Sequence, residues 1–235
     1  MIHVKTNLMS SIQQYLLSSI YCNNLNVADK IKQTIPFLSE KMGFDASFIR
    51  DTLSELEKEG LITTNFNASK ITNSINNHND YKIHRLTELG RSKIRVVLVG
   101  GVFDLLHSGH IHTLKSAKAL GDVLIIVVAT DNNVYNAKKN RKIYHNEKSR
   151  LELVSSIHFV DKAIIGSKRS IYETVEFVKP DIIALGYDQF HDEKLMKKNC
   201  LERGINLEVV RLSSPVPQLK SSVIKNELGT SFYDL

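Results

Sequence analysis

The sequence lacks long apolar runs and has only two cysteines. No stretch approaches the roughly 18–20 apolar residues of a membrane-spanning helix, so we expect no membrane association. The first 24 residues lack a long apolar core followed by a small-residue cleavage site, which predicts a cytoplasmic protein without a secretory signal. Cys22 and Cys200 match no metal-binding or redox spacing, and reduced thiols are therefore expected.

A strong charge of either sign is also missing. The formal net charge is +6, and apolar residues make up 42% and charged residues 24%, an ordinary globular composition. The mild positive charge suits phosphate-rich substrates, but it is too diffuse to indicate a nucleic-acid-binding protein. A length of 235 residues allows one large domain or two modest ones.

The sequence changes character near residue 93, which predicts one domain over 1–93 and a second over 94–235. The first region has a helical pattern at 10–22, an apolar patch at 31–42 in which Pro36 should open or break a helix, and a helix from Asp45 to Gly60. Two short β-runs, 61–64 and 81–87, flank a polar segment and predict a hairpin. This order resembles a small winged-helix domain over residues 5–93.

In the second region, β-runs alternate with helical patterns. Continuous apolar strands between amphipathic helices predict an α/β domain with a doubly wound, Rossmann-like parallel sheet covered on both faces. Its ligand should lie beyond the carboxyl ends of the strands. The β-runs are 95–101, 122–130, 162–166, 181–186 and 206–212, and the helical patterns are 110–121, 147–158, 170–179 and 192–204.

The segment 99–114, VGGVFDLLHSGHIHTL, contains the strongest functional signal. It follows a buried β-run at 96–99, its glycine pair 100–101 allows a tight turn, and His107 and His110 fall where a helix would begin. A strand, a turn and a helix N-terminus form an anion site. Two imidazoles three residues apart share a helix face and can reach one phosphoryl group. The segment therefore predicts a nucleotidyltransferase.

The motif GGVFDLLHSGH resembles the G-[TS]-F-D-x-x-H-x-G-H signature of the cytidylyltransferase-like nucleotidyltransferase superfamily, and the similarity runs over 95–228. The resemblance implies that His107 and His110 stabilise the pentacoordinate transition state. It also implies nucleotide contacts within the motif, with Val102 departing from the usual Thr or Ser, and Asp104 either carrying metal-linked charge or fixing the loop. The nucleotide-binding candidates here are Val102, Phe103, Asp104, Ser108 and Gly109.

Three later segments extend the resemblance. In the family, a basic loop grips the phosphates, an arginine in the following helix supports the site, an acid after the fourth strand contacts the nucleotide, and a hydroxyl pair begins the last helix. A basic residue on the preceding strand approaches the same pair. The matching residues are Lys138, Lys139, Arg141 and Lys142 in the loop, Arg150 in the helix, Asp188 after the strand, Arg211, and Ser221 and Ser222.

The segment 164–193 resembles archaeal-type FAD synthases, with its IIGS, KPDIIALGYDQ and DE elements. This similarity implies transfer of AMP from ATP to FMN, with a divalent metal ion, magnesium, on the triphosphate. One alternative is a cytidylyltransferase that uses CTP and a small phosphorylated alcohol such as glycerol 3-phosphate. Another is a winged-helix regulator whose α/β domain senses a nucleotide without turnover.

The first domain does not have the charge of a DNA-binding module. Its presumptive recognition helix, 45–60, carries five acidic residues against Arg50 and Lys58, and residues 1–93 contain eleven Lys and Arg against nine Asp and Glu. Phosphate attraction supplies most non-specific DNA affinity, so an acidic helix works against binding. DNA binding is possible but not favoured, and a structural role or homo-oligomerisation is expected instead.

Overall fold

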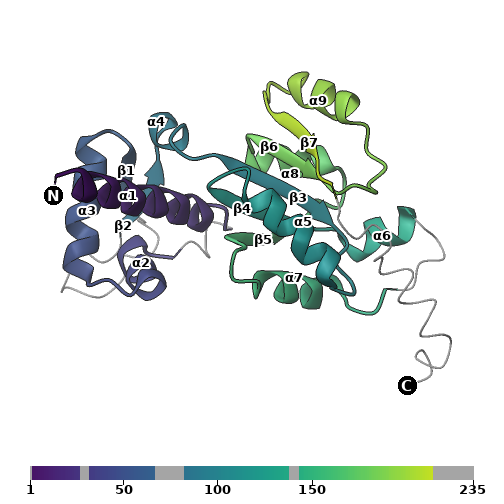
Figure 1. Cartoon of the computed structure of the whole chain (residues 1–235), viewed down its shortest axis with the longest axis horizontal. Helices are drawn as coiled ribbons and strands as arrows, with labels where there is room; N and C mark the ends of the chain where they lie inside the picture. Colours follow the sequence, from purple (N-terminus) through teal and green to yellow (C-terminus); the bar gives the residue numbers. More distant parts are fainter. Residues whose placement is uncertain (1, 27–31, 67–81, 138–142, 214–235) are drawn as a thin grey trace. The chain divides into compact units, whose positions relative to one another are not determined.

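The computed structural model describes residues 2–26, 32–66, 82–137 and 143–213. The chain divides into two compact units, Met1–Ile94 and Arg95–Leu235, and each is described by itself (Figure 1). Among the described residues, no helix is both long enough and apolar enough to cross a membrane. Cys22 and Cys200 are buried free thiols, as expected.

The first unit contains helices followed by a hairpin. Asp45 begins its third helix by accepting a hydrogen bond from the Ser47 backbone N–H, and Gly43 ends the second with a left-handed φ of 69°. Pro36 lies in the first turn of the second helix, where its missing N–H is tolerated, so it does not break that helix. The elements are α1 Ile2–Asn24, α2 Thr34–Met42, α3 Ala46–Lys58, β1 Ile62–Phe66, β2 Lys82–Leu86 and α4 Glu88–Arg91.

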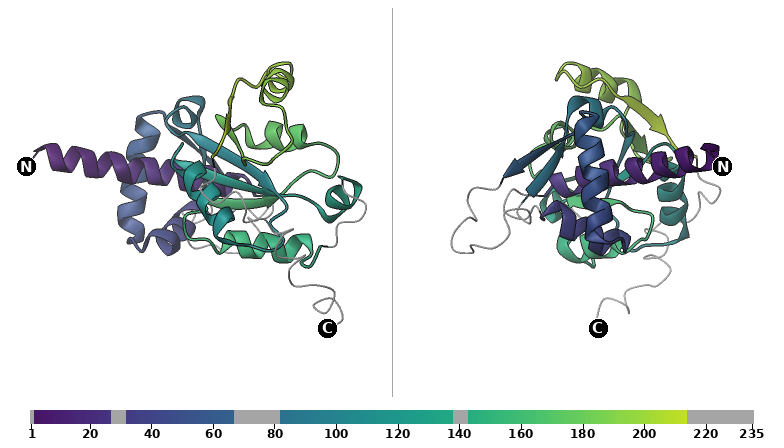
Figure 2. Two further views of the ribbon diagram at one scale, coloured as in Figure 1. Left: turned by 45° about the vertical axis from the view of Figure 1, so that its right-hand side comes forward. Right: turned by 90° about the vertical axis from the view of Figure 1, so that its left-hand side faces the viewer.

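The core of the first unit lies between its three long helices and the hairpin. Leu16 and Ile20 of α1, Leu38 of α2 and Leu56 of α3 are almost completely buried. The strands β1 and β2 pair antiparallel, with Ile62 opposite Leu86. Figure 2 shows α1 as one continuous helix whose N-terminal turns extend beyond the other elements of this unit.

The second unit is built on a five-stranded sheet in the order β5-β4-β3-β6-β7, with every neighbouring pair parallel. This confirms the predicted doubly wound α/β fold. The strands are β3 Val96–Gly101, β4 Val123–Val128, β5 Lys162–Ile165, β6 Ile182–Leu185 and β7 Glu208–Arg211, and the helices are α5 Ser108–Lys118, α6 Asp131–Ala137, α7 Glu147–Ser155, α8 Ile171–Val178 and α9 Glu193–Leu201. Only the short helix α6 was not predicted from the sequence.

Helices cover both faces of this sheet (Figure 1). On one face, Leu114 of α5 and Val154 of α7 join a buried cluster with Val99 and Ile126. On the other face, α8 approaches Val127, since Thr174 and Val127 both lie close to Gly166. Every residue of β4 is buried, which explains why this strand reads as an uninterrupted apolar run.

The strand order reverses at β3. From β3 the chain continues to β4 and β5 on one side of the sheet, and it then crosses to β6 and β7 on the other side. The loops that follow β3 and β6 therefore border the crevice where doubly wound sheets bind ligands. The paired positions Val97 and Ile182 and a 2.6 Å hydrogen bond from the Val96 backbone N–H to the Asp181 carboxylate fix these two strands together.

Candidate active site at the switch point of the sheet

The turn after β3 is made by Phe103. This residue has a φ of 54°, in the left-handed region that non-glycine residues seldom adopt. Gly100 and Gly101 remain inside the strand, paired with Val127 and Val128, so the expectation of a tight turn at the glycines is corrected. A side chain on Gly101 would place its Cβ 2.7 Å from Cζ of Phe103. Glycine is therefore needed at position 101 to make room for the Phe103 ring, which is buried.

His107 and His110 lie together at the start of α5, as their spacing predicts. His107 is the N-cap residue and His110 lies in the first turn, with the two ring centroids 4.0 Å apart. The His107 backbone N–H donates to Nδ1 of His110 over 3.4 Å. Because that nitrogen accepts, a neutral His110 carries its proton on Nε2. The Nε2–H group is then a donor for a substrate oxygen.

His107 is held in a site that favours a neutral ring. Burial lowers the pKa of His107, and the carboxylate of Asp188 acts in the opposite direction. Its Nδ1 is buried without a hydrogen-bond partner in the described part of the chain. A buried polar atom of this kind is costly unless something satisfies it.

Asp104 fixes the loop that precedes α7. Its side chain is 1% exposed. The carboxylate accepts hydrogen bonds from the backbone N–H groups of Tyr144 and His145 at 2.9–3.1 Å. Nδ1 of His145 lies 3.0 Å from the Asp104 carbonyl oxygen. Of the two roles considered for Asp104, metal-linked charge and fixing the loop, these hydrogen bonds are those of a residue that fixes the loop.

Arg150 is a buried strut between loops. Its side chain is fully buried, and its guanidinium donates to the carbonyl oxygens of Val102, Ala129 and His145 over 2.5–3.0 Å. A fourth hydrogen bond, 2.6 Å long, reaches the Asp131 carboxylate. Since no face of this side chain is open, its contacts are those of a residue that supports, from beneath, the loop between β3 and α5 (residues 102–107, the histidine loop). The similar family arginine implied such a supporting role, and a direct nucleotide contact of Arg150 stays a prediction.

Arg211 supports the loop after β6 in the same manner. It donates to the carbonyl oxygens of Gly186, Gln189 and His191 over 2.6–3.0 Å, and to the Glu193 carboxylate over 2.7 Å. The predicted approach of Arg211 to the hydroxyl pair stays a prediction, since Ser221 and Ser222 lie outside the described residues. The loop that Arg211 holds carries Asp188, which is exposed and close enough to His107 to affect the pKa of that ring.

The remaining predicted residues fall into two groups. Ser108 is exposed in the first turn of α5, Gly109 is buried beside it, and Val102 is partly buried at the start of the loop between β3 and α5. The other group lies outside the described residues and comprises Lys138, Lys139, Arg141, Lys142, Ser221 and Ser222. Within the described ranges, no group of three or more His, Cys, Asp or Glu side chains could hold a metal ion.

Sequence reasoning missed two residues that shape the crevice. Gln189 donates from Nε2 to the Gly100 carbonyl over 2.8 Å, which joins the loops after β3 and β6. His145 brings its backbone and its ring to Asp104. A polar residue next to the predicted Asp188 was the available signal for Gln189, but nothing in the sequence indicated its partner.

These features define a nucleotide-binding α/β domain with a histidine pair at its switch point. The chain belongs to the cytidylyltransferase-like family, whose model matches residues 98–227. Within that family, it is similar to the FAD synthases of Picrophilus torridus (44% identity, over 54% of this chain and 89% of the relative) and Aciduliprofundum boonei (49% identity, over 49% and 76%). A solved structure from Thermoplasma volcanium, described as a lipopolysaccharide core biosynthesis protein, is 45% identical, with a TM-score of 0.50 over 52% of this chain and 98% of that chain.

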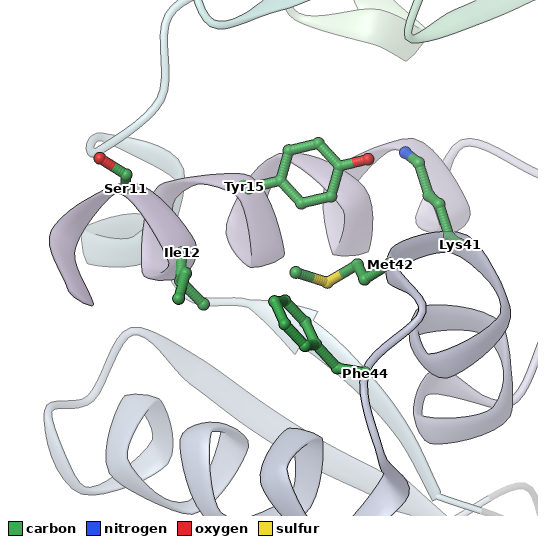
Figure 3. Close-up of a pocket in the computed structure, with 6 residues that line it drawn as sticks. All are labelled: Ser11, Ile12, Tyr15, Lys41, Met42 and Phe44. Atoms are coloured by element: carbon green, nitrogen blue, oxygen red, sulfur yellow. The ribbon is translucent and has the colours of Figure 1, made fainter. Parts of the chain in front are cut away.

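The first unit has a separate small pocket. It is lined by Ser11, Ile12 and Tyr15 of α1, by Lys41 and Met42 at the end of α2 and by Phe44 just after it, with no acid, histidine or cysteine among them (Figure 3). Lys41 donates to the Ser19 hydroxyl and lies over the Tyr15 ring.

Proposed function

We propose that this protein is an FMN adenylyltransferase, an FAD synthase that converts ATP and FMN into FAD and pyrophosphate. The observation that carries the proposal is the His107–His110 pair at the N-terminus of α5, beside the switch point of the sheet. The choice of substrates is supported by FAD synthase relatives that are 41–49% identical and are covered over most of their length.

The proposed reaction is a direct displacement at the α-phosphorus of ATP. An oxygen of the FMN phosphate attacks the α-phosphorus, the new P–O bond forms, and the bond to the β-phosphate oxygen breaks to release pyrophosphate. The protein has to position the two substrates and stabilise the negative charge that spreads over the phosphoryl oxygens. The Nε2–H of His110, the ring of His107 and the positive end of α5 supply that stabilisation.

ATP enters as its magnesium complex, so that the metal ion arrives with the substrate. Magnesium in phosphoryl-transfer sites is commonly bound by substrate phosphates, water and one or two carboxylates. The described residues offer no larger ligand cluster, which is compatible with this arrangement. The exposed carboxylate of Asp188 borders the same crevice and is proposed to contact the nucleotide.

The test is a pyrophosphate-release assay that crosses ATP or CTP with FMN, glycerol 3-phosphate or phosphoethanolamine. We expect release only with ATP and FMN together, and FAD as the product. Activity with CTP alone would overturn the FAD synthase assignment.

Replacing a histidine of the pair should slow the reaction strongly. His107→Ala and His110→Ala are each expected to lower kcat by about 10²–10³-fold, the scale for loss of one preorganised donor. The matched control is His158→Ala. His158 is an exposed histidine that precedes β5, so it lies near the amino end of a strand, whereas the histidine pair follows the carboxyl end of β3. Near-normal rates in both pair variants would refute the proposed mechanism.

For the first unit we infer a winged-helix-like module with a structural or oligomerising role. Support comes from the order of its elements and from α3, whose exposed positions include Asp51, Glu55 and Glu57. A low-salt gel shift with the full chain should show no complex with random DNA. A shifted band would contradict the inference that the first unit has a structural or oligomerising role. Light scattering on the same sample should give a mass above that of one chain.

A further inference from the structure

Phe190 is the most solvent-exposed large apolar residue among those whose exposure the structure describes. Its exposed fraction is 86%, against 62% or less for each of the others. A phenylalanine left in water forgoes about 1.5–3 kcal/mol of burial free energy, so this position contributes nothing to the stability of the free protein. The residue therefore needs an explanation other than folding.

The place of Phe190 in the fold suggests one. It lies in the loop after β6, which borders the switch-point crevice, two residues beyond Asp188 and next to Gln189. The hydrogen bond from Gln189 to the Gly100 carbonyl joins this loop to the end of β3, where the histidine loop begins. The exposed ring and the two histidines are thus carried by loops at the same edge of the sheet.

The backbone on both sides of Phe190 is fixed by one side chain. Arg211 donates to the carbonyl oxygen of Gln189, which precedes Phe190, and to that of His191, which follows it. The same guanidinium also pairs with Glu193. An exposed ring on a backbone held in this way loses little conformational freedom when it binds, which is the condition for an effective binding platform.

The neighbouring ring widens this platform. The centroids of Phe190 and His191 are 4.4 Å apart, with their planes inclined by 32°. A phenyl ring has no hydrogen-bonding group, so it cannot recognise a phosphate or a ribose hydroxyl. It can stack on a flat heteroaromatic ring, an interaction favoured in offset geometry. Both substrates of the proposed reaction contain such a ring.

We propose that Phe190 is a substrate-binding residue that stacks on the planar heteroaromatic ring of a substrate in the switch-point crevice. This inference rests on the proposed function, which supplies two sources of that ring, the isoalloxazine of FMN and the adenine of ATP. The experiment separates the two sources.

The main variant is Phe190→Leu, which keeps an apolar side chain but removes the stacking surface. We expect the KM of one substrate to rise about 5- to 100-fold, the range for loss of one stacked ring, with kcat nearly unchanged. Phe190→Tyr should stay close to wild type because it keeps the ring. The matched control is Phe177→Leu on α8, where the ring is also exposed, and no KM should change.

Direct binding gives a readout that does not depend on turnover. FMN binding is followed by the change in flavin fluorescence without ATP, and ATP binding by calorimetry without FMN. Weaker FMN binding in Phe190→Leu would assign the isoalloxazine ring, and weaker ATP binding would assign adenine. Because the side chain is exposed, the Tm should not change, so a loss of affinity cannot be attributed to unfolding.

Unchanged affinities and KM values in Phe190→Leu would overturn the stacking proposal. If the wild-type protein still made FAD, the proposed function would stand despite that result. A wild-type protein that bound neither FMN nor ATP would refute the proposed function and the stacking together.

Discussion

Each side of the catalytic crevice is supported by one arginine side chain, and the two arginines differ in how deeply they are buried. Arg150 donates to three backbone carbonyls and one carboxylate beneath the loop after β3, and Arg211 does the same beneath the loop after β6. The Arg150 side chain is fully buried, whereas that of Arg211 is 29% exposed. The planar guanidinium, with five N–H donors in a fixed geometry, suits both tasks.

The difference in depth indicates different consequences of losing each arginine. Without Arg150, three partly buried carbonyls would lose the donor that its fully buried guanidinium supplies, and each group left unsatisfied costs about 1–3 kcal/mol. Without Arg211, water could replace some of the lost hydrogen bonds. The histidine side is therefore part of the folded core, and the Phe190 side is a surface loop that is held in place.

The largest expected effect is that of Arg150→Leu. We expect it to lower the free energy of unfolding of the second unit by about 3–5 kcal/mol, because three partly buried carbonyls lose their hydrogen-bond donor at once. Urea denaturation followed by circular dichroism measures this change. Arg169→Leu, at an exposed arginine, should change it by less than about 0.5 kcal/mol. A stable and fully active Arg150→Leu protein would show that the buried strut is dispensable.

A smaller effect on stability is expected from Arg211→Met. Because this side chain is partly hydrated, we expect a loss of about 1–2 kcal/mol. The loop that carries Asp188 and Phe190 should loosen, so the KM of the substrate stacked on Phe190 should rise more than kcat falls. Arg211→Lys should restore the charge but not the three carbonyl contacts, because an ammonium lacks the planar fork. Equal changes in kcat and KM in the two variants would contradict a role in positioning the loop.

The smallest expected effect is a change in pH dependence in Asp188→Asn. Burial lowers the pKa of His107, and the Asp188 carboxylate raises it by favouring the imidazolium. If neutral His107 is the working form, kcat/KM is retained above this pKa and lost as the pH falls through it. Removing the carboxylate lowers the pKa further, so the acidic limb of kcat/KM should move to lower pH. The control is Glu202→Gln on the surface, and an acidic limb that moves to higher pH in Asp188→Asn would refute the assignment.

The sequence predicted the strands of the second unit because their burial on both faces leaves a direct mark. The residues of β4 are all apolar since every one is covered. The helix α6 left no such pattern in the sequence, because its segment DNNVYNA offers Val134 as a buried apolar residue within a mostly polar stretch. Its start is stabilised locally instead, by a hydrogen bond from the Asn133 N–H to the Thr130 hydroxyl. A pattern-based prediction needs several apolar positions, and this helix lacks them.

The histidine pair could be predicted because both residues are local to one turn of helix. The roles of Arg150 and Arg211 could not be predicted in the same way. Arg150 bonds to a carbonyl 48 residues away, and Arg211 to carbonyls 20–25 residues away. Sequence alone cannot distinguish a guanidinium that faces a phosphate from one that faces the protein's own backbone, because the two require the same residue type.

The central position of β3 has a consequence for the order in which the active site forms. Both histidines follow β3 directly, but the strand that completes the crevice, β6, begins 86 residues after the start of β3, at Ile182 against Val96. During synthesis, the histidine loop therefore leaves the ribosome well before Asp181, Asp188 and Phe190 exist. Contacts of such long separation form late and slowly, because a long loop must close before they are gained. The recovery of activity in a refolding experiment should accordingly follow the docking of β6 rather than the formation of α5.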